Sequence, residues 1–173
     1  MSVVALVPDH DDLRRIGEAF ELYVAQQLRP HGFVLDRCTS YRDQLRIGEN
    51  LLGLEIKFDR KVRETGNLYI ETEERHPKSP STHMRASGIF RDDQSWLYGI
   101  GDHDRFYIFS KRHLRSLFWD LKSGSPLLGI AFKAIGTSRG FVFPVRSVSG
   151  HVERIYASDQ PGGPWRVLSL EAW

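Results

Sequence analysis

The chain has 173 residues, of which 40% are apolar and 27% are charged, and these proportions are ordinary for one globular domain. The net charge of +2 excludes a strongly basic or acidic protein, so an anionic partner must meet a local patch of positive charge. The single cysteine, Cys38, excludes an internal disulfide framework and a cysteine-based zinc site. No apolar run approaches the roughly 20 residues that cross a bilayer, and no basic segment precedes the first apolar run. We therefore expect a cytoplasmic protein with no signal peptide and no membrane partner.

A long helix over residues 13–28 is the first predicted element. An aspartate at position 11 or 12 can cap it, and a proline and a glycine just past it can end it. Its apolar residues recur at helical spacing and comprise Leu13, Ile16, Phe20, Val24 and Leu28. Glu21 lies at the margin of this stripe, and this position taken alone favours a solvated flank residue over a functional one.

Two short strands are predicted next, at 33–35 and 45–49. The polar segment between them contains Asp43, at the point where a turn leads into the second strand.

Residues 53–59 are the stretch on which the functional prediction depends. Read with the period of a strand, one face is wholly apolar and comprises Leu52, Leu54, Ile56 and Phe58. The other face carries Glu55, Lys57 and Asp59. Residues two apart on a strand lie about 7 Å apart and point the same way, so a carboxylate and an ammonium are held side by side. The pair is either a salt bridge at a sheet margin or a working pair.

A charged connection over 59–66 leads to another predicted strand at 67–73, in which Glu71 and Glu73 share one face. The order so far predicts a helix followed by a meander of three or four strands, with acids on a common side. Residues 74–87 are predicted to be a loop.

Two strands, at 95–100 and 105–109, are predicted around a turn at 101–104. Ser110 can then cap a basic helix over 111–121. Beyond residue 124 the chain is punctuated by glycine and proline and favours short strands, at 127–132, 140–148, 152–157 and 165–170. We divide the chain into a core over 1–123 and a β-rich C-terminal extension over 124–173, packed on the same domain.

The acidic residues offer the best candidate for chemistry. Neither a phosphate-binding loop nor a dinucleotide-binding glycine motif is present, and no histidines have metal-ligand spacing. Glu21, Asp43 and Glu55 supply the hard oxygen ligands that Mg²⁺ or Mn²⁺ prefers. A lysine two residues after a ligand carboxylate, as Lys57 is, can orient a metal-bound water or neutralise charge on a phosphate.

These residues resemble the PD-(D/E)xK nucleases, the restriction-endonuclease-like superfamily. Asp43, eleven intervening residues and then Glu55-Ile56-Lys57 are similar to the family motif, and the helix with Glu21 matches a glutamate that many members carry. The resemblance covers about residues 13–109. It departs from the motif because Arg42, and not a proline, precedes the first acid, and Asp36 and Glu49 compete with Asp43 for that role.

The resemblance implies an α/β (α+β) fold with a central mixed sheet flanked by helices. It implies that Asp43, Glu55 and the carbonyl of Ile56 bind the metal and that Lys57 positions the attacking water. Glu21 is then a ligand of a second metal or a support of the first, and Glu71 is a candidate in the outer shell.

DNA is the partner that the resemblance implies. Basic groups around the acids suit a phosphate backbone, and the candidates are Arg42, Arg46, Lys61 and Arg63. The cations of the later helix, including Lys111, are better explained as solvated charges. Trp96 and Tyr98 can stack on bases, although a core role is expected for at least one of them.

The predicted function is therefore a divalent-metal-dependent DNA endonuclease. The alternative is a catalytically silent relative that kept the fold as a nucleic-acid-binding or assembly module, and a third is an enzyme acting on another phosphate ester. The sequence leaves open the form of the substrate, any recognition sequence and the oligomeric state, although many members of the family form homodimers.

Overall fold

The computed structural model describes residues 10–36, 38, 40, 42–43, 48, 50–75, 82–127 and 129–169. The helical elements are α1 (His10–Leu28), η1 (Arg29–His31), α3 (Val62–Thr65), η2 (Gly88–Phe90), α4 (Lys111–Lys122) and η3 (Val145–Ser147). The strands are β1 (Leu54–Phe58), β2 (Asn67–Glu74), β3 (Arg85–Ala86), β4 (Leu97–Gly101), β5 (Arg105–Ser110), β6 (Ala131–Ile135), β7 (Ser138–Pro144), β8 (Arg154–Ser158) and β9 (Trp165–Leu168).

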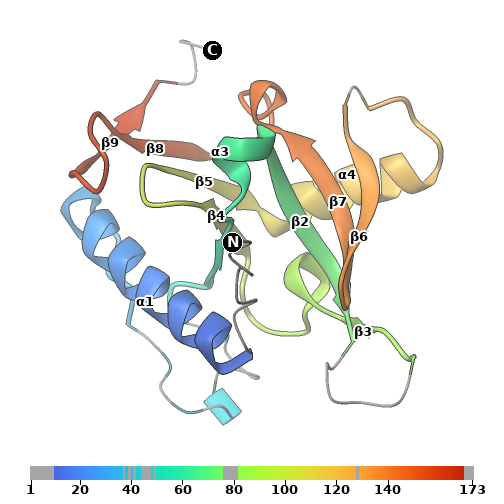
Figure 1. Ribbon diagram of the computed structural model, residues 1–173, viewed down its shortest axis with the longest axis horizontal. Coiled ribbons are helices and arrows are strands. Elements are labelled where there is room, and N and C mark those ends of the chain that lie inside the picture. Colours follow the sequence, from blue (N-terminus) through green and yellow to red (C-terminus); the bar gives the residue numbers. More distant parts are fainter. Residues whose placement is uncertain are drawn as a thin grey trace, which may run out of the picture.

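The described strands form two sheets, as Figure 1 shows. The first has the order β1-β4-β5-β8-β9, with β1 parallel to β4 and the other neighbours antiparallel. The second has the order β3-β2-β7-β6 and is antiparallel throughout. The predicted α+β class with a mixed sheet is therefore confirmed.

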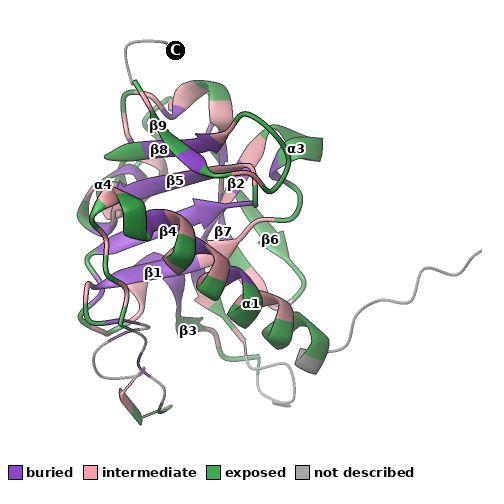
Figure 2. Cartoon of the chain, turned by 90° about the vertical axis from the view of Figure 1, so that its left-hand side faces the viewer, coloured by how far each residue is buried: buried purple, intermediate pink, exposed green. Residues whose placement is uncertain are grey.

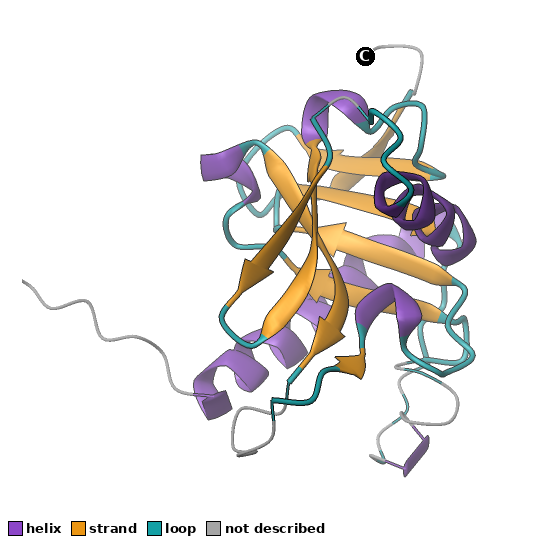
Figure 3. Ribbon diagram, turned by 90° about the vertical axis from the view of Figure 1, so that its right-hand side faces the viewer, coloured by secondary structure: helices purple, strands orange, loops and turns teal. Residues whose placement is uncertain are grey.

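Two hydrophobic clusters hold these layers together. Helix α1 crosses one face of the first sheet (Figure 2), and there Phe20, Val24 and Leu28 pack with Leu54 and Ile56 of β1. The other cluster joins the opposite face of the first sheet to the second sheet and α4, with Tyr98, Phe109, Leu114, Ile70 and Phe141 among its members. The second sheet lies in front of the first in Figure 3. Alternate residues of β1 therefore point either to α1 or toward the second sheet.

Local signals predicted several elements correctly. The long helix is present as α1, although it begins at His10, and the strand at 67–73 is β2. The hairpin at 95–109 is present as β4 and β5. Ser110 caps α4, because its hydroxyl accepts a hydrogen bond from the backbone N–H of His113.

The predicted meander is wrong in its central feature. Strands β1 and β2 follow one another in sequence, but they lie in different sheets, because β1 pairs with β4 and β2 pairs with β7. The connection between them contains the short helix α3. Residues 33–35 do not form a strand, and most of the predicted strand at 45–49 lies outside the described residues.

The residues after 123 are built into both sheets. Strands β6 and β7 complete the second sheet beside β2, and β8 and β9 extend the first sheet beyond β5. The predicted extension is therefore β-rich, and its strands pair directly with those of the predicted core.

Candidate functional site

Strand β1 presents Glu55 and Lys57 on the face that looks toward the second sheet, because Leu54 and Ile56 point to α1. The ammonium of Lys57 lies 2.9 Å from Glu55 Oε1. Glu55 has no exposed surface, whereas about a third of the Lys57 side chain, 32%, is exposed. The predicted side-by-side pair is therefore present, with the carboxylate inside the protein and the ammonium at its surface.

Three further charged residues surround Glu55. Lys111 Nζ lies 2.7 Å from Glu55 Oε2 and 3.4 Å from Asp93 Oδ1. Arg91 lies 3.9 Å from Glu55 Oε1 through one terminal nitrogen, and its Nε donates to Asp93 Oδ2. The charge network thus comprises three cations and two carboxylates, and its net charge is one positive unit.

The sheet register places Lys111 beside Glu55. Residue pairs across β1 and β4 include Glu55 with Tyr98, and those across β4 and β5 include Leu97 with Ser110. Lys111 follows Ser110 directly, and its backbone N–H donates to the carbonyl of Trp96 at 2.9 Å. The side chain of Lys111 consequently lies in the interior, although Lys111 is the first residue of a helix. This side chain is among the most buried of the large side chains.

These contacts keep both carboxylates ionised. Burial pushes the pKa of Glu55 upward, but Lys57, Arg91 and Lys111 outweigh it, so the pKa lies below its ordinary value. The pKa of Asp93 is also lowered, because the opposing effect of burial is overcome by Arg91 and Lys111. Burial and then the charge of Glu55 raise the pKa of Tyr98 well above its usual value, so this phenol stays neutral.

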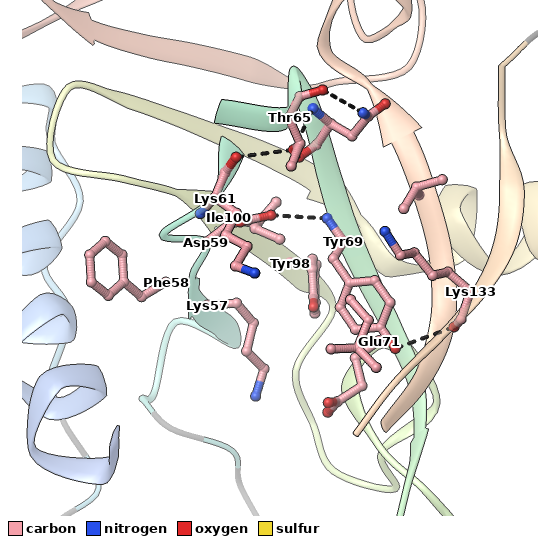
Figure 4. A pocket seen from close by; sticks show the side chains of 13 residues that line it. Lys57, Phe58, Asp59, Lys61, Thr65, Tyr69, Glu71, Tyr98, Ile100 and Lys133 are labelled. Carbon is pink, nitrogen blue, oxygen red and sulfur yellow. Dashed lines mark hydrogen bonds between the residues drawn. The ribbon is translucent and has the colours of Figure 1, made fainter. Parts of the chain in front are cut away.

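A pocket of about 290 Å³ opens between β1 and β2, and Figure 4 shows the side chains that line it. Lys57 reaches it from β1 and Glu71 from β2, and both extend in the same direction in the figure. The other charged residues of its lining are Asp59, Lys61 and Lys133. This Lys57 pocket therefore has three cationic and two anionic side chains.

Both acids of the Lys57 pocket are already bonded by the protein. Glu71 accepts hydrogen bonds from Ser87 at 2.6 Å and from Ser138 at 2.7 Å, one on each carboxylate oxygen. Asp59 accepts backbone N–H groups of Lys61 and Tyr69, each at 3.0 Å. Burial raises the pKa of Asp59 despite these bonds. The hydrogen bonds fix the two carboxylates to the pocket wall and reduce their availability to a ligand.

The other two acids predicted to be catalytic, Glu21 and Asp43, lie on other elements of the fold. Glu21 is half-buried on α1, which packs on the face of β1 opposite to Glu55. Asp43 is in a helical turn and not at the start of a strand, with its Oδ2 accepting from the Ser40 hydroxyl at 2.6 Å. Its backbone N–H donates back to the same hydroxyl at 3.1 Å. The competing Glu49 lies outside the described residues.

The described residues do not fit the expected Mg²⁺ or Mn²⁺ centre. Among them, no three histidine, cysteine or acidic side chains come together as a metal-binding group. Each oxygen of Glu55 has an ammonium within 3 Å, from Lys57 on one side and Lys111 on the other. A hard divalent cation needs several oxygen ligands and is repelled by such a pair of ammonium groups. In this arrangement both oxygens of Glu55 are held by ammonium groups and not presented to a metal ion.

The predicted DNA-binding cations are divided among several places. Lys61 lines the Lys57 pocket, and Arg42 is exposed. Arg63 is instead held by acids of the β4–β5 turn, at 2.6 Å from Asp102 and in contact with Asp104. Arg46 lies outside the described residues.

Two further expectations concerned aromatic residues and the basic helix. Tyr98 is fully buried and Trp96 is exposed, so one of these two aromatics has the expected core role. The prediction that Lys111 is a solvated charge is wrong, and Arg91 and Asp93 were not predicted at all. One signal for Lys111 is present in the sequence: a cation in the first turn of a helix is unfavourable to the helix dipole, so it indicates a specific anionic partner.

Comparisons with known proteins add no family to this description. No family model, curated protein or solved structure matches the chain. Within the described residues, no helix combines the length and apolar character needed to cross a membrane.

Proposed function

We propose that this chain is a nucleic-acid-binding protein that holds the phosphate backbone at the Lys57 pocket. The observation that carries the proposal is the position of the Lys57 ammonium. The buried carboxylate of Glu55 lies 2.9 Å from this ammonium and fixes its position. Lys57 lines a pocket that Lys61 and Lys133 also line. A cation held in this way at the wall of a pocket is well suited to a phosphate oxygen.

The charge network explains why Lys57 retains attraction for an anion. Glu55 shares its negative charge with Lys111 on its other oxygen, so it does not neutralise Lys57 alone. The five charged groups sum to one positive unit, and this unit is retained in the pocket because Lys61 and Lys133 balance the charges of Asp59 and Glu71. Phosphate binding would release counterions from the nucleic acid, which is the main source of affinity in such contacts.

Metal-dependent DNA endonuclease is the second candidate, and it rests on the resemblance to the PD-(D/E)xK nucleases. The observation that favours it is that Glu55 and Lys57 lie on one face of a strand and that Lys57 lines a pocket with other charged residues. It requires Glu55 to exchange its ammonium partners for other ligands, with Asp43 and Glu21 brought to the same face of β1. The restriction-endonuclease-like core and its homodimeric state remain part of this candidate.

A binding titration tests the first proposal. Fluorescence anisotropy of a labelled DNA duplex is measured at several salt concentrations for the wild type, for Lys57→Ala and for Arg15→Ala, which removes an exposed charge from α1. We expect Lys57→Ala to weaken binding to all sequences alike and to reduce the salt slope by about one unit. Arg15→Ala should leave the affinity near that of the wild type. Equal affinities of the wild type and Lys57→Ala would refute phosphate binding at this pocket.

A cleavage assay separates the two candidates. Plasmid and single-stranded DNA are incubated with Mg²⁺ or Mn²⁺ and the wild type, Lys57→Ala or Glu55→Gln. Binding without cleavage supports the module, whereas cleavage that both substitutions abolish supports the endonuclease. Cleavage that survives both substitutions would show a contaminating or unrelated activity.

A further inference from the structure

Helix α4 passes behind β6, the edge strand of the second sheet, in Figure 1, and three aromatic side chains, two of them exposed, lie where these elements meet. Phe132 of β6 is 52% exposed and Trp119 of α4 is 54% exposed. Phe118 lies between them, with ring centroids 5.5 Å from Phe132 and 5.1 Å from Trp119, each in an edge-to-face arrangement. Phe118, Trp119 and Phe132 together form the aromatic patch.

One lysine lies against the aromatic patch, and further cations line a groove beside it. Lys122 Nζ lies 5.0 Å from the centre of the Trp119 ring. A groove of about 390 Å³ adjoins the patch and is lined by Phe118, Phe132, Lys122, Lys133 and Arg139. Glu73 also lines the groove, and its carboxylate lies 3.8 Å from the guanidinium of Arg139. Both side chains are exposed, so this ion pair contributes little stability. The groove therefore has more positive than negative charge beside its rings.

The same strand links the aromatic patch to the Lys57 pocket. Strand β6 pairs with β7 on one side, and no other described strand pairs with its second side. All five of its residues are exposed, and Lys133 lines both the Lys57 pocket and the groove. A nucleic-acid strand that crosses β6 would thus contact the lysines of the Lys57 pocket and then the rings of the aromatic patch.

We propose that the aromatic patch stacks unpaired bases, so that the preferred ligand of this protein is single-stranded nucleic acid. This inference rests on the proposed function, because the phosphates of the same strand are held at the Lys57 pocket. Exposed rings beside lysines are the features by which proteins bind single strands without reading sequence, since every base offers a π face. Duplex bases are stacked on each other and cannot reach the patch, so the rings add affinity for a single strand alone.

The test compares two ligands with matched variants. A labelled oligothymidylate and a labelled duplex of the same length are titrated by anisotropy against the wild type, Trp119→Ala and Phe132→Ala. The conservative variants Trp119→Phe and Phe132→Tyr keep a ring, and Leu22→Ala removes an equally exposed apolar side chain from α1. We expect each alanine variant to bind the oligothymidylate about fivefold or more weakly and the duplex unchanged. The conservative variants and Leu22→Ala should bind like the wild type, and circular dichroism melting checks that all variants fold.

Several results would overturn the inference. One is an equal loss for both ligands in the alanine variants, and another is no loss for the oligothymidylate. A wild type that is dimeric by light scattering, with a monomeric Trp119→Ala, would show that a second copy covers the patch. Lys57→Ala tests the underlying proposal separately, because it should weaken single-strand and duplex binding together. Loss of single-strand binding in Trp119→Ala but not in Lys57→Ala would support the patch and refute the phosphate site.

Discussion

Lys111, the first residue of α4, places its ammonium 2.7 Å from Glu55, the buried second residue of β1. The same ammonium lies 3.4 Å from Asp93, so one lysine holds two carboxylates in the interior. Lys57 contacts Glu55 from the other side and is partly open to solvent. The two lysines therefore have different roles. Lys111 compensates the buried negative charge of Glu55 and Asp93, and Lys57 presents its positive charge to the pocket.

Replacement of Lys111 by methionine should destabilise the fold strongly. The substitution keeps much of the side-chain volume but leaves Glu55 and Asp93 with less compensating charge inside the protein. Removing one partner of a buried ion pair costs about 3–5 kcal/mol, and we expect a loss in that range in the free energy of unfolding by urea. Lys122→Met, at an exposed position of the same helix, should cost about 1 kcal/mol or less. Similar losses for the two variants would contradict the compensating role of Lys111.

The stability of the protein should fall in acid. The folded pKa of Glu55 lies below the ordinary value of 4.5, because its three cations outweigh the effect of burial. The folded state therefore binds fewer protons than the unfolded state as the pH drops below that value. This contribution is fully present above about pH 4.5 and is lost as the pH falls through the folded pKa. Asp93 acts in the same direction, whereas Asp59, whose pKa is raised by burial, opposes it.

Urea unfolding from pH 7 to pH 3 measures this loss, and Glu55→Gln provides the comparison. The variant should be less stable than the wild type at neutral pH, because Lys57 and Lys111 lose their partner, and its stability should depend less on pH in the acid range. A wild type whose unfolding midpoint is constant over the range would argue against an ionised, cation-bound Glu55.

Lys57 should matter less for stability than Lys111 does. Its side chain is 32% exposed, so water can replace part of what it gives to Glu55, and Lys111 and Arg91 remain in place. We expect Lys57→Met to cost about 1–2 kcal/mol of unfolding free energy, less than the loss for Lys111→Met. Nucleic-acid binding should show the reverse order when both variants are compared at a temperature where both are folded. An equal effect of Lys57→Met and Lys111→Met on stability would make Lys57 a structural residue.

Residue patterns within single segments of the sequence predict several of the helices and strands. The stripe of Phe20, Val24 and Leu28 predicts α1, and the alternation around Glu55 predicts β1 with its paired charges. Ser110 followed by an apolar stripe predicts α4 and its cap. Each of these depends on neighbours within about one helical turn or a few strand residues, and periodicity reports such relationships directly.

The pairing of distant segments could not be read in the same way. Strand β2 has the alternation of β1, so nothing local indicates that its partner is β7 in a second sheet. The parallel pairing of β1 with β4 decides where Lys111 goes, and this choice depends on how the whole core packs. A lysine after a helix cap therefore reads as a surface charge, although its place in the first turn is electrostatically unfavourable. Among the described residues, Glu21, Asp43 and Glu55 do not form one metal-binding group, and sequence order does not say on which face of a sheet a helix such as α1 lies.

A pair of histidines that line another groove, and not the Lys57 pocket, should respond to pH. His113 of α4 and His151 lie with ring nitrogens 2.9 Å apart, Nε2 to Nδ1, and their rings are stacked. Arg112 and Glu153 line the same groove. Burial first, and then the charge of His113, lowers the pKa of His151. Because the hydrogen bond needs one unprotonated nitrogen as acceptor, double protonation breaks it.

The sign of the effect on stability follows from the lowered pKa. Unfolded His151, with an ordinary pKa of 6.5, binds a proton more readily than the folded residue, so stability declines as the pH falls below about 6.5. Titration of the His151 ring protons by NMR should give a pKa below that value in the wild type. In His113→Phe, which keeps an aromatic ring but carries no charge, the pKa of His151 should rise part of the way back, because burial remains. An unchanged pKa of His151 in this variant would mean that burial alone sets it and that the histidines are not coupled.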